Sequence, residues 1–143
     1  MYYNSVGRNC NLLLNANPGP DGLVPEADFQ KYVAFGKEIR RRFDRPAAET
    51  RGAGTLVTLT LPRPQPVNHV MLMEEISRGE RIRAYRVAGQ APGGAWQPLC
   101  TGISVGHKRI QTFERAVVSG IRLHVTETVG EPLIRRLAVF DVT

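Results

Sequence analysis

The chain has 143 residues, 42% of them apolar, which is enough to bury a hydrophobic core and excludes a disordered chain. It carries 19 Lys and Arg against 13 Asp and Glu, and the formal net charge of +6 suits an anionic partner. The basic residues are spread along the chain, however, and their one dense cluster, residues 40–42 with Arg45, has neither an aromatic platform nor a zinc-finger spacing beside it. The composition therefore predicts a folded domain that does not bind nucleic acid.

The two cysteines, Cys10 and Cys100, lie far apart in the sequence and are predicted to be buried free thiols rather than a disulfide. No metal-ligand spacing surrounds either of them, and we expect no cofactor and no metal. No apolar run approaches the length of a membrane-spanning helix, so a membrane is not an expected partner. Met1 is followed by polar residues, including Asn4 and Arg8, rather than by a signal peptide, and the sequence leaves the compartment open.

A short apolar run near the amino terminus, residues 12–14, predicts a buried strand. Asn11 and Asn15 bound the run, and residues 17–22 that follow are turn formers. A buried strand needs a neighbour on each side, and nothing before residue 12 supplies one. We therefore expect the run to find cover, either because the amino-terminal segment folds back on the rest of the chain or because it pairs with a second copy.

An amphipathic helix is expected from Pro25 to Phe43. Its apolar positions recur at helical spacings, which places them on one face. Glu26 and Asp28 suit the first turn and the arginine cluster suits the last, because the helix dipole favours anions at the start and cations at the end. The cluster therefore has a structural explanation. The apolar stripe consists of Phe29, Tyr32, Val33, Gly36, Ile39 and Phe43.

The rest of the sequence is typical of β-structure. Residues 44–54 lose periodicity and gain Pro and Gly, which predicts a linker. Residues 55–61 alternate as in a half-buried strand, and Pro62, Pro64 and Pro66 predict a turn after them. Further strands are expected at residues 68–73, 81–88, 95–101, 109–113, 119–126 and 136–142. This series, with no second helix, predicts a mainly β fold: an antiparallel β-sandwich of jelly-roll type. The expected core contains Leu72, Val87, Trp96, Ile121, Leu123, Val125, Leu137, Ala138, Val139 and Phe140.

Several motifs, taken in order along the chain, resemble the α-L-fucosidases of glycoside hydrolase family 29. Residues 5–15 and 19–22 are similar to the last strand and loop of that family's catalytic (β/α) barrel, although Cys10 stands where most members have Gly. The expected helix is similar to the final barrel helix. The resemblance implies a barrel remnant at residues 1–45 and a discoidin-like, galactose-binding-like β-sandwich at residues 46–143. The matches within the sandwich are residues 71–85, 106–110, 125–127 and 132–136.

Enzymes of this family hydrolyse terminal α-L-fucose with retention, through an aspartate nucleophile and a carboxylic acid/base on the barrel. A retaining mechanism needs those two carboxyl groups about 5 Å apart, and neither motif has a counterpart in this sequence. The resemblance therefore implies a carboxyl-terminal fragment with no catalytic residue and no activity alone, whose first partner is the missing catalytic barrel. It also implies a periplasmic or secreted parent enzyme.

Three roles remain open for the sandwich: support of the barrel, which we favour, binding of galactosylated or fucosylated glycans, and contact with a protein or an anionic surface. Sugar binding by such a module uses loop side chains that pair with hydroxyl groups. The candidate residues are His107, Lys108, Arg109, Glu75 and, at the end of the expected barrel strand, Asn15.

These candidates have structural alternatives. Glu74 or Glu75 can form charge-assisted bonds with Arg81 or Arg109 that tie two loops together. Trp96 can be a sugar platform, but its place at the start of an expected strand favours the core. The two other histidines are expected to be structural, because neither has a partner at metal or triad spacing: His69 and His124.

Overall fold

The computed structural model describes all 143 residues, as one α-helix, two short 3-10 helices and six strands. All strand pairs are antiparallel, in the order β1-β6-β2-β5-β3-β4. No helix has the length and apolar character that crossing a membrane requires. The elements are η1 (Tyr2–Asn4), α1 (Glu26–Phe43), β1 (Ala48–Ala53), β2 (Leu56–Glu74), η2 (Ile76–Arg78), β3 (Ile82–Gln90), β4 (Trp96–Gly102), β5 (Arg109–Thr128) and β6 (Leu133–Phe140).

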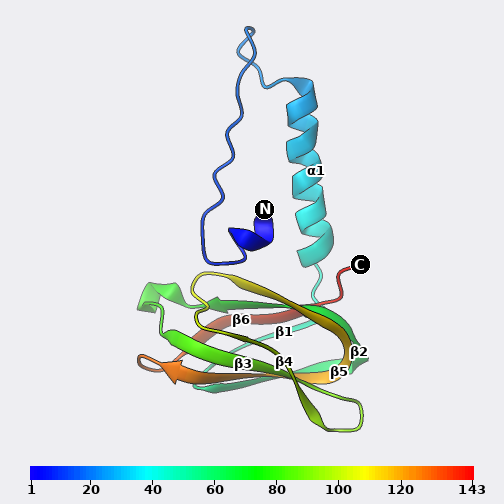
Figure 1. Cartoon of the computed structure of the whole chain (residues 1–143), viewed down its shortest axis with the longest axis vertical. Coiled ribbons are helices and arrows are strands. Elements are labelled where there is room, and N and C mark those ends of the chain that lie inside the picture. The colour runs from blue at the N-terminus through cyan, green and yellow to red at the C-terminus, as the bar shows by residue number, and fades with distance from the viewer.

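Two long strands, β2 and β5, connect the two layers of the molecule (Figure 1). In one layer, residues 56–60 of β2 pair with residues 120–124 of β5, beside β3 and β4. In the other layer, residues 69–72 of β2 pair with residues 109–112 of β5, beside β6 and β1. Side chains of both layers meet in one core, in which Leu72, Val87 and Leu123 have no exposed surface. The expected antiparallel β-sandwich is confirmed.

The strand β6 is buried on both faces, as its sequence predicts. Leu137 and Val139 belong to the core between the layers, whereas Ala138 and Phe140 belong to a second apolar cluster on the opposite face. That second cluster lies under the amino-terminal residues and the end of α1. One outer face of the sandwich is therefore covered by the amino-terminal residues and the end of α1 instead of by solvent.

Three predictions about the segments between strands are wrong. Residues 48–53, expected in a linker, form the edge strand β1, because its backbone pairs with β6 whatever its side chains are; Gly52 lies at a register shift. The prolines at positions 62, 64 and 66 do not turn the chain. Pro62 and Pro64 fall where pairing with β5 is interrupted between Thr60 and Gln65, since proline has no N–H for a ladder, whereas Pro66 lies opposite Val117 in the resumed pairing, and β2 continues beyond all three. The strands expected at 109–113 and 119–126 likewise form one strand, β5.

The helix is confirmed within one residue as α1, but the strand expected at residues 12–14 does not form. No strand of this chain lies beside it, so its backbone has no ladder to join. Residues 11–24 instead run in an extended path beside α1, away from the sandwich (Figure 1), and the Tyr32 hydroxyl donates to the Asn15 carbonyl. Leu13 is 88% exposed. The expected folding back occurs only for residues 1–10, where Asn9 N–H donates to the Lys108 carbonyl.

An aromatic cluster joins α1 and the amino-terminal segment to the sandwich. Phe43, the only buried residue of α1, packs edge-on against Phe140, with ring centroids 5.3 Å apart. The ring centroids of Tyr2, Tyr3 and His69 lie 5.9, 5.8 and 6.1 Å from the centroid of the Phe43 ring. We call these five residues the neck cluster. It fixes the direction in which α1 leaves the sandwich.

Three expected burials, those of Trp96, Cys10 and Cys100, are wrong or only partial. Trp96 is half-buried at the start of β4 rather than in the core, and the Arg122 guanidinium stacks on its ring at 3.9 Å. Cys10 is exposed, because the chain leaves the sheet at that point. Cys100 is half-buried, and burial raises the pKa of its thiol to about 11. Both thiols are free, as expected.

Candidate functional site

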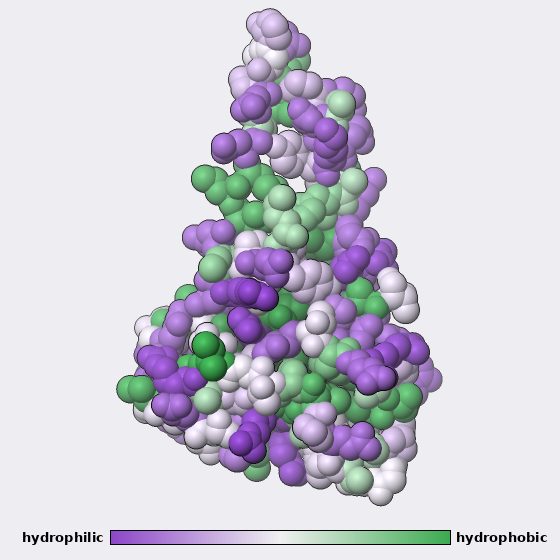
Figure 2. All heavy atoms as spheres, viewed as in Figure 1, coloured by the Kyte–Doolittle hydropathy of each residue, from purple (hydrophilic) through white to green (hydrophobic).

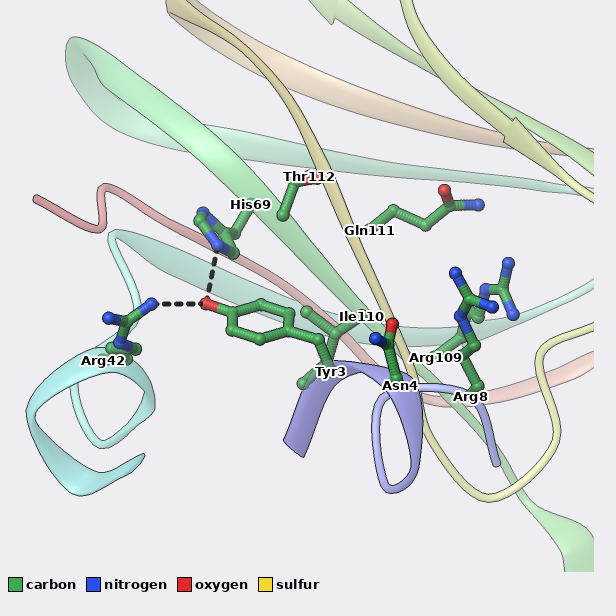
Figure 3. A pocket seen from close by; sticks show the side chains of 9 residues that line it. All are labelled: Tyr3, Asn4, Arg8, Arg42, His69, Arg109, Ile110, Gln111 and Thr112. Atoms are coloured by element: carbon green, nitrogen blue, oxygen red, sulfur yellow. Dashed lines mark hydrogen bonds between the residues drawn. The ribbon is translucent and has the colours of Figure 1, made fainter. Parts of the chain in front are cut away.

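A polar hollow of about 390 Å³ lies beside the neck cluster, between the amino-terminal segment, the end of α1 and the strands β2 and β5 (Figure 3). Three arginines from three separate elements line it: Arg8, Arg42 and Arg109. Tyr3 and His69 lie on the α1 side. No acidic side chain lines the hollow, so its charge is positive. Such a site favours an anion with oxygen atoms that accept hydrogen bonds.

A chain of hydrogen bonds organises the α1 side of the hollow. Asn68 exchanges two bonds with the Val142 backbone, which fixes its amide so that Oδ1 is an acceptor. His69 Nδ1 lies 2.6 Å from that oxygen and therefore donates to it, which leaves Nε2 as the acceptor of the Tyr3 hydroxyl at 2.8 Å. The Tyr3 oxygen then accepts from Arg42 at 3.2 Å. Both hydrogen bonds of the His69 ring, one donated by Nδ1 and one accepted by Nε2, form together only when the imidazole is neutral.

The electrostatics of His69 agree with this assignment. Burial lowers the pKa of His69, and the Arg42 charge lowers it further, whereas Asp141 opposes them. Arg42 also binds Glu38, 2.6 Å away, and Arg41 and Arg42 together lower the pKa of the Glu38 carboxyl to about 2. Arg42 therefore stays charged and in place beside Tyr3.

His69 is expected to make the chain less stable in mild acid. Because its pKa is lower in the folded state than its ordinary value of 6.5, the unfolded state binds more protons below that pH. The free energy of unfolding should be at its full value above pH 6.5 and should fall as the pH decreases through the folded-state pKa. Urea unfolding between pH 5 and 8 measures it. His69→Gln should lose this dependence and His124→Gln, on an exposed residue, should keep it; equal curves for wild type and His69→Gln would contradict the assignment.

On the other side of the hollow, the two remaining arginines lie opposite each other. Arg8 and Arg109 form an antiparallel bridge, and none of the ion pairs of the structure includes either of them. The Nε atom of Arg109 is buried and has no hydrogen-bond partner. The Arg109 charge lies near Cys100, where it partly offsets the effect of burial on the thiol pKa.

The sequence candidates do not gather at this hollow. Of the run at residues 107–109, only Arg109 lines it. His107 is exposed, and its backbone N–H donates to Asn9 Oδ1 at 2.6 Å. Lys108 Nζ lies 5.9 Å from the centre of the Tyr2 ring. The amino-terminal segment therefore covers much of the loop that we expected to be free.

The two other candidates lie elsewhere. The Glu75 side chain accepts from the Ser77 hydroxyl at 2.8 Å and caps η2, and this hydrogen bond lowers the pKa of Glu75. Asn15 is exposed on the extended segment beside α1. The structure does not bring these side chains together with His107 or Lys108 at one sugar site.

A glutamate does join two loops, as expected, but the donors are backbone N–H groups instead of arginine side chains. Glu74 is 1% exposed, and its carboxylate accepts from the backbone N–H groups of Arg81, Ile82 and Gly106 at 2.8, 3.1 and 2.8 Å. The Arg81 guanidinium donates to the Glu131 carbonyl instead. Glu74 therefore holds the loop before β3 to the loop before β5 and is not available to a ligand.

Sequence reasoning missed Tyr3, Arg8 and Arg42 as members of a site. Arg42 had a sufficient explanation as a charge at the end of the helix, and no periodic pattern marks Tyr3 or Arg8. The pairing of the first ten residues with β5 places Tyr3 and Arg8 at the hollow, and the end of α1 brings Arg42 to the Tyr3 hydroxyl. No three His, Cys, Asp or Glu side chains lie where they could hold a metal ion.

No family model matches the chain. A crystal structure described as an α-L-fucosidase from Bacteroides thetaiotaomicron is 42% identical, has a TM-score of 0.96, and matches 99% of this chain and 33% of its own. A glycoside hydrolase 29 family member from a rumen bacterium is 29% identical with a TM-score of 0.83, over 99% of this chain and 28% of its own. Alpha-L-fucosidase 1 from Arabidopsis thaliana is 26% identical over 98% of this chain and 35% of its own length.

The chain thus spans about a third of the relatives that it matches, and nearly all of the chain takes part in each match. The similarity includes the amino-terminal segment and α1 as well as the sandwich, since the matched share of the chain leaves out neither. This chain is therefore related, over nearly its whole length, to the carboxyl-terminal region of the α-L-fucosidases of glycoside hydrolase family 29.

Proposed function

We propose that the chain is the β-sandwich module of an α-L-fucosidase and supports a catalytic (β/α) barrel formed by another part of that enzyme. The observation that carries the proposal is the apolar surface above the neck cluster (Figure 2). Leu13, Leu23 and Phe29 are 88%, 68% and 50% exposed, and they belong to the extended segment and α1. Several large apolar side chains left exposed within one stretch of chain, residues 13–29, mark an interface with another folded unit.

The arrangement suits a barrel as the partner. The neck cluster holds α1 upright on the sandwich, and the backbone of the extended segment beside it is paired with no strand of this chain. A barrel offers strands to pair with such a segment and a groove to receive a helix. We place the boundary between the barrel-side part and the sandwich between residues 45 and 46, and we assign the sandwich to the discoidin-like, jelly-roll type.

We assign the hydrolysis of terminal α-L-fucose to the barrel and not to this chain. A retaining glycosidase needs two carboxyl groups about 5 Å apart across the sugar. Three of the acidic side chains are held by partners within the chain: Glu38 by Arg41 and Arg42, Asp141 by Arg115 at 2.7 Å, and Glu74 by backbone N–H groups. The polar hollow beside the neck cluster has no acid in its lining, and the mainly apolar hollow against α1 contains only Glu38, which Arg41 and Arg42 bind.

A chimera tests the proposal. This chain replaces the matched third of the Bacteroides thetaiotaomicron relative, which is 42% identical. We expect one cooperative unfolding transition and retained hydrolysis of an aryl α-L-fucoside, because the two parts stabilise each other. Leu13→Ser in the chimera should lower the free energy of unfolding by about 2 kcal/mol, the value of a buried leucine side chain.

The control is Ile103→Ser, in the loop before β5, where the side chain is 77% exposed. It should change the free energy of unfolding by less than about 0.5 kcal/mol, as surface substitutions do. Two separate unfolding transitions, or equal effects of Leu13→Ser and Ile103→Ser, would contradict the proposal. In the isolated chain, the same surface is proposed to drive self-association, which light scattering measures.

Glycan binding is the second role to separate by experiment. The exposed His107 side chain supports it, but the Trp96 ring, which would be the platform, is stacked by Arg122. The geometry therefore favours support of the barrel. Calorimetric titration of the chain with galactose and fucose distinguishes the two roles, because only sugar binding produces saturable heat.

A further inference from the structure

The pairing of Arg8 with Arg109 is the most unusual feature of the hollow. Asn9 N–H donates to the Lys108 carbonyl and Ile110 N–H donates to the Gly7 carbonyl, both at 2.9 Å. With these flanking bonds, the two arginines form the non-hydrogen-bonded kind of antiparallel pair, in which opposed side chains lie closest. Figure 3 shows both side chains on the same side of the backbone, toward the hollow.

Two like charges directly opposite each other destabilise an antiparallel pair. No acid lines the hollow, neither arginine has an ion-pair partner in the chain, and Glu38 is taken by Arg41 and Arg42. The buried Nε of Arg109 also has no acceptor. The chain itself therefore supplies no counter-charge to this pair, and the exposed Arg8 leaves it open to a partner from outside the chain.

Two features identify the occupant. Guanidinium groups present paired donors that match the two oxygens of a carboxylate. The hollow opens beside the neck cluster, at the foot of the apolar surface formed by α1 and the extended segment. We propose that Arg8 and Arg109 bind a carboxylate side chain of the catalytic barrel at the interface between the two domains. This inference rests on the proposed function and names the chemistry that the partner supplies.

The first test uses the isolated chain, with inorganic sulfate as the probe of the site. Millimolar sulfate at constant ionic strength should raise the melting temperature in a saturable way, and Arg8→Gln and Arg109→Gln should abolish this effect. Arg63→Gln, at an exposed position of β2, is the control and should leave it unchanged. A sulfate effect that is absent, or that survives in both variants, would overturn the site itself.

The second test compares the same variant in two settings. In the isolated chain, Arg8→Gln should raise the folding equilibrium constant about twofold, because it removes a like-charge pair. In the chimera, it should lower that constant about tenfold, because the barrel carboxylate loses a charge-assisted partner. A merely structural arginine would change both proteins in the same direction, and that result would overturn the inference.

The two proposals fail in different ways. A cooperative, active chimera in which Arg8→Gln has no effect would retain the proposed function and overturn the carboxylate contact. If sulfate binds in that case, the hollow takes a free anion and not a barrel side chain. A chimera that unfolds in two separate transitions would overturn the supporting function and the carboxylate contact together, and the sulfate titration would still report on the hollow.

Discussion

Replacing Glu74 with alanine should lower the free energy of unfolding by about 3–5 kcal/mol, the range for removing one partner of a buried charged network. The carboxylate is 1% exposed and satisfies three backbone N–H groups, those of Arg81, Ile82 and Gly106. Alanine leaves all three donors without an acceptor and removes the tie between two loops. Urea denaturation followed by circular dichroism measures the loss.

The neighbouring residue is the matched control. Glu75 carries the same side chain, but its main partner is Ser77 in the exposed cap of η2. Glu75→Ala should change the free energy of unfolding by less than about 1 kcal/mol. Glu74→Gln, which keeps one acceptor oxygen, should fall between the two alanine variants. Equal losses for the two alanine variants would show that the buried network does not hold the loops.

Replacing Phe43 with alanine should separate the barrel-side part from the sandwich. Phe43 is 7% exposed and contacts four aromatic rings of the neck cluster, and removing a buried phenylalanine lowers stability by about 3–5 kcal/mol. The loss should be local, because Phe43 belongs to the second cluster and not to the core between the layers. Amide hydrogen exchange should show lost protection in residues 1–10 and α1, with β2 and β5 still protected.

Phe29→Ala provides the comparison for this variant. Phe29 lies on the same apolar stripe of α1 but is 50% exposed, so in the isolated chain its loss should change protection little. In the chimera, where we propose that this surface is covered, the same variant should become destabilising. If the Phe43→Ala variant lost amide-exchange protection throughout its β-strands, the neck cluster would be part of the main core.

Local patterns in the sequence predicted the elements whose stability is local. The helix has an apolar stripe and matched end charges, so α1 was found within one residue. The alternation of residues 119–126 placed Ile121, Leu123 and Val125 in the core correctly. The motifs of residues 5–15 and 71–85 also carried the resemblance to family 29 fucosidases.

Elements that depend on a partner were predicted poorly. Residues 12–14 have the composition of a buried strand and remain exposed, because no strand of this chain pairs with them. The strand β1 lacks a strand-like pattern and forms because β6 offers its free edge. Prolines predicted a turn in β2, but the strand continues through them, with Pro62 and Pro64 where the ladder with β5 is interrupted and Pro66 opposite Val117.

The amino-acid sequence by itself determined the helix, the alternating core strands, the β-rich class and the family resemblance, because each depends on neighbours along the chain. Only the tertiary structure decided the neck cluster, the buried role of Glu74 and the opposed pair of Arg8 and Arg109. Those features join residues far apart in sequence, and the register of one segment on another sets which side chains meet. Local patterns do not contain that register.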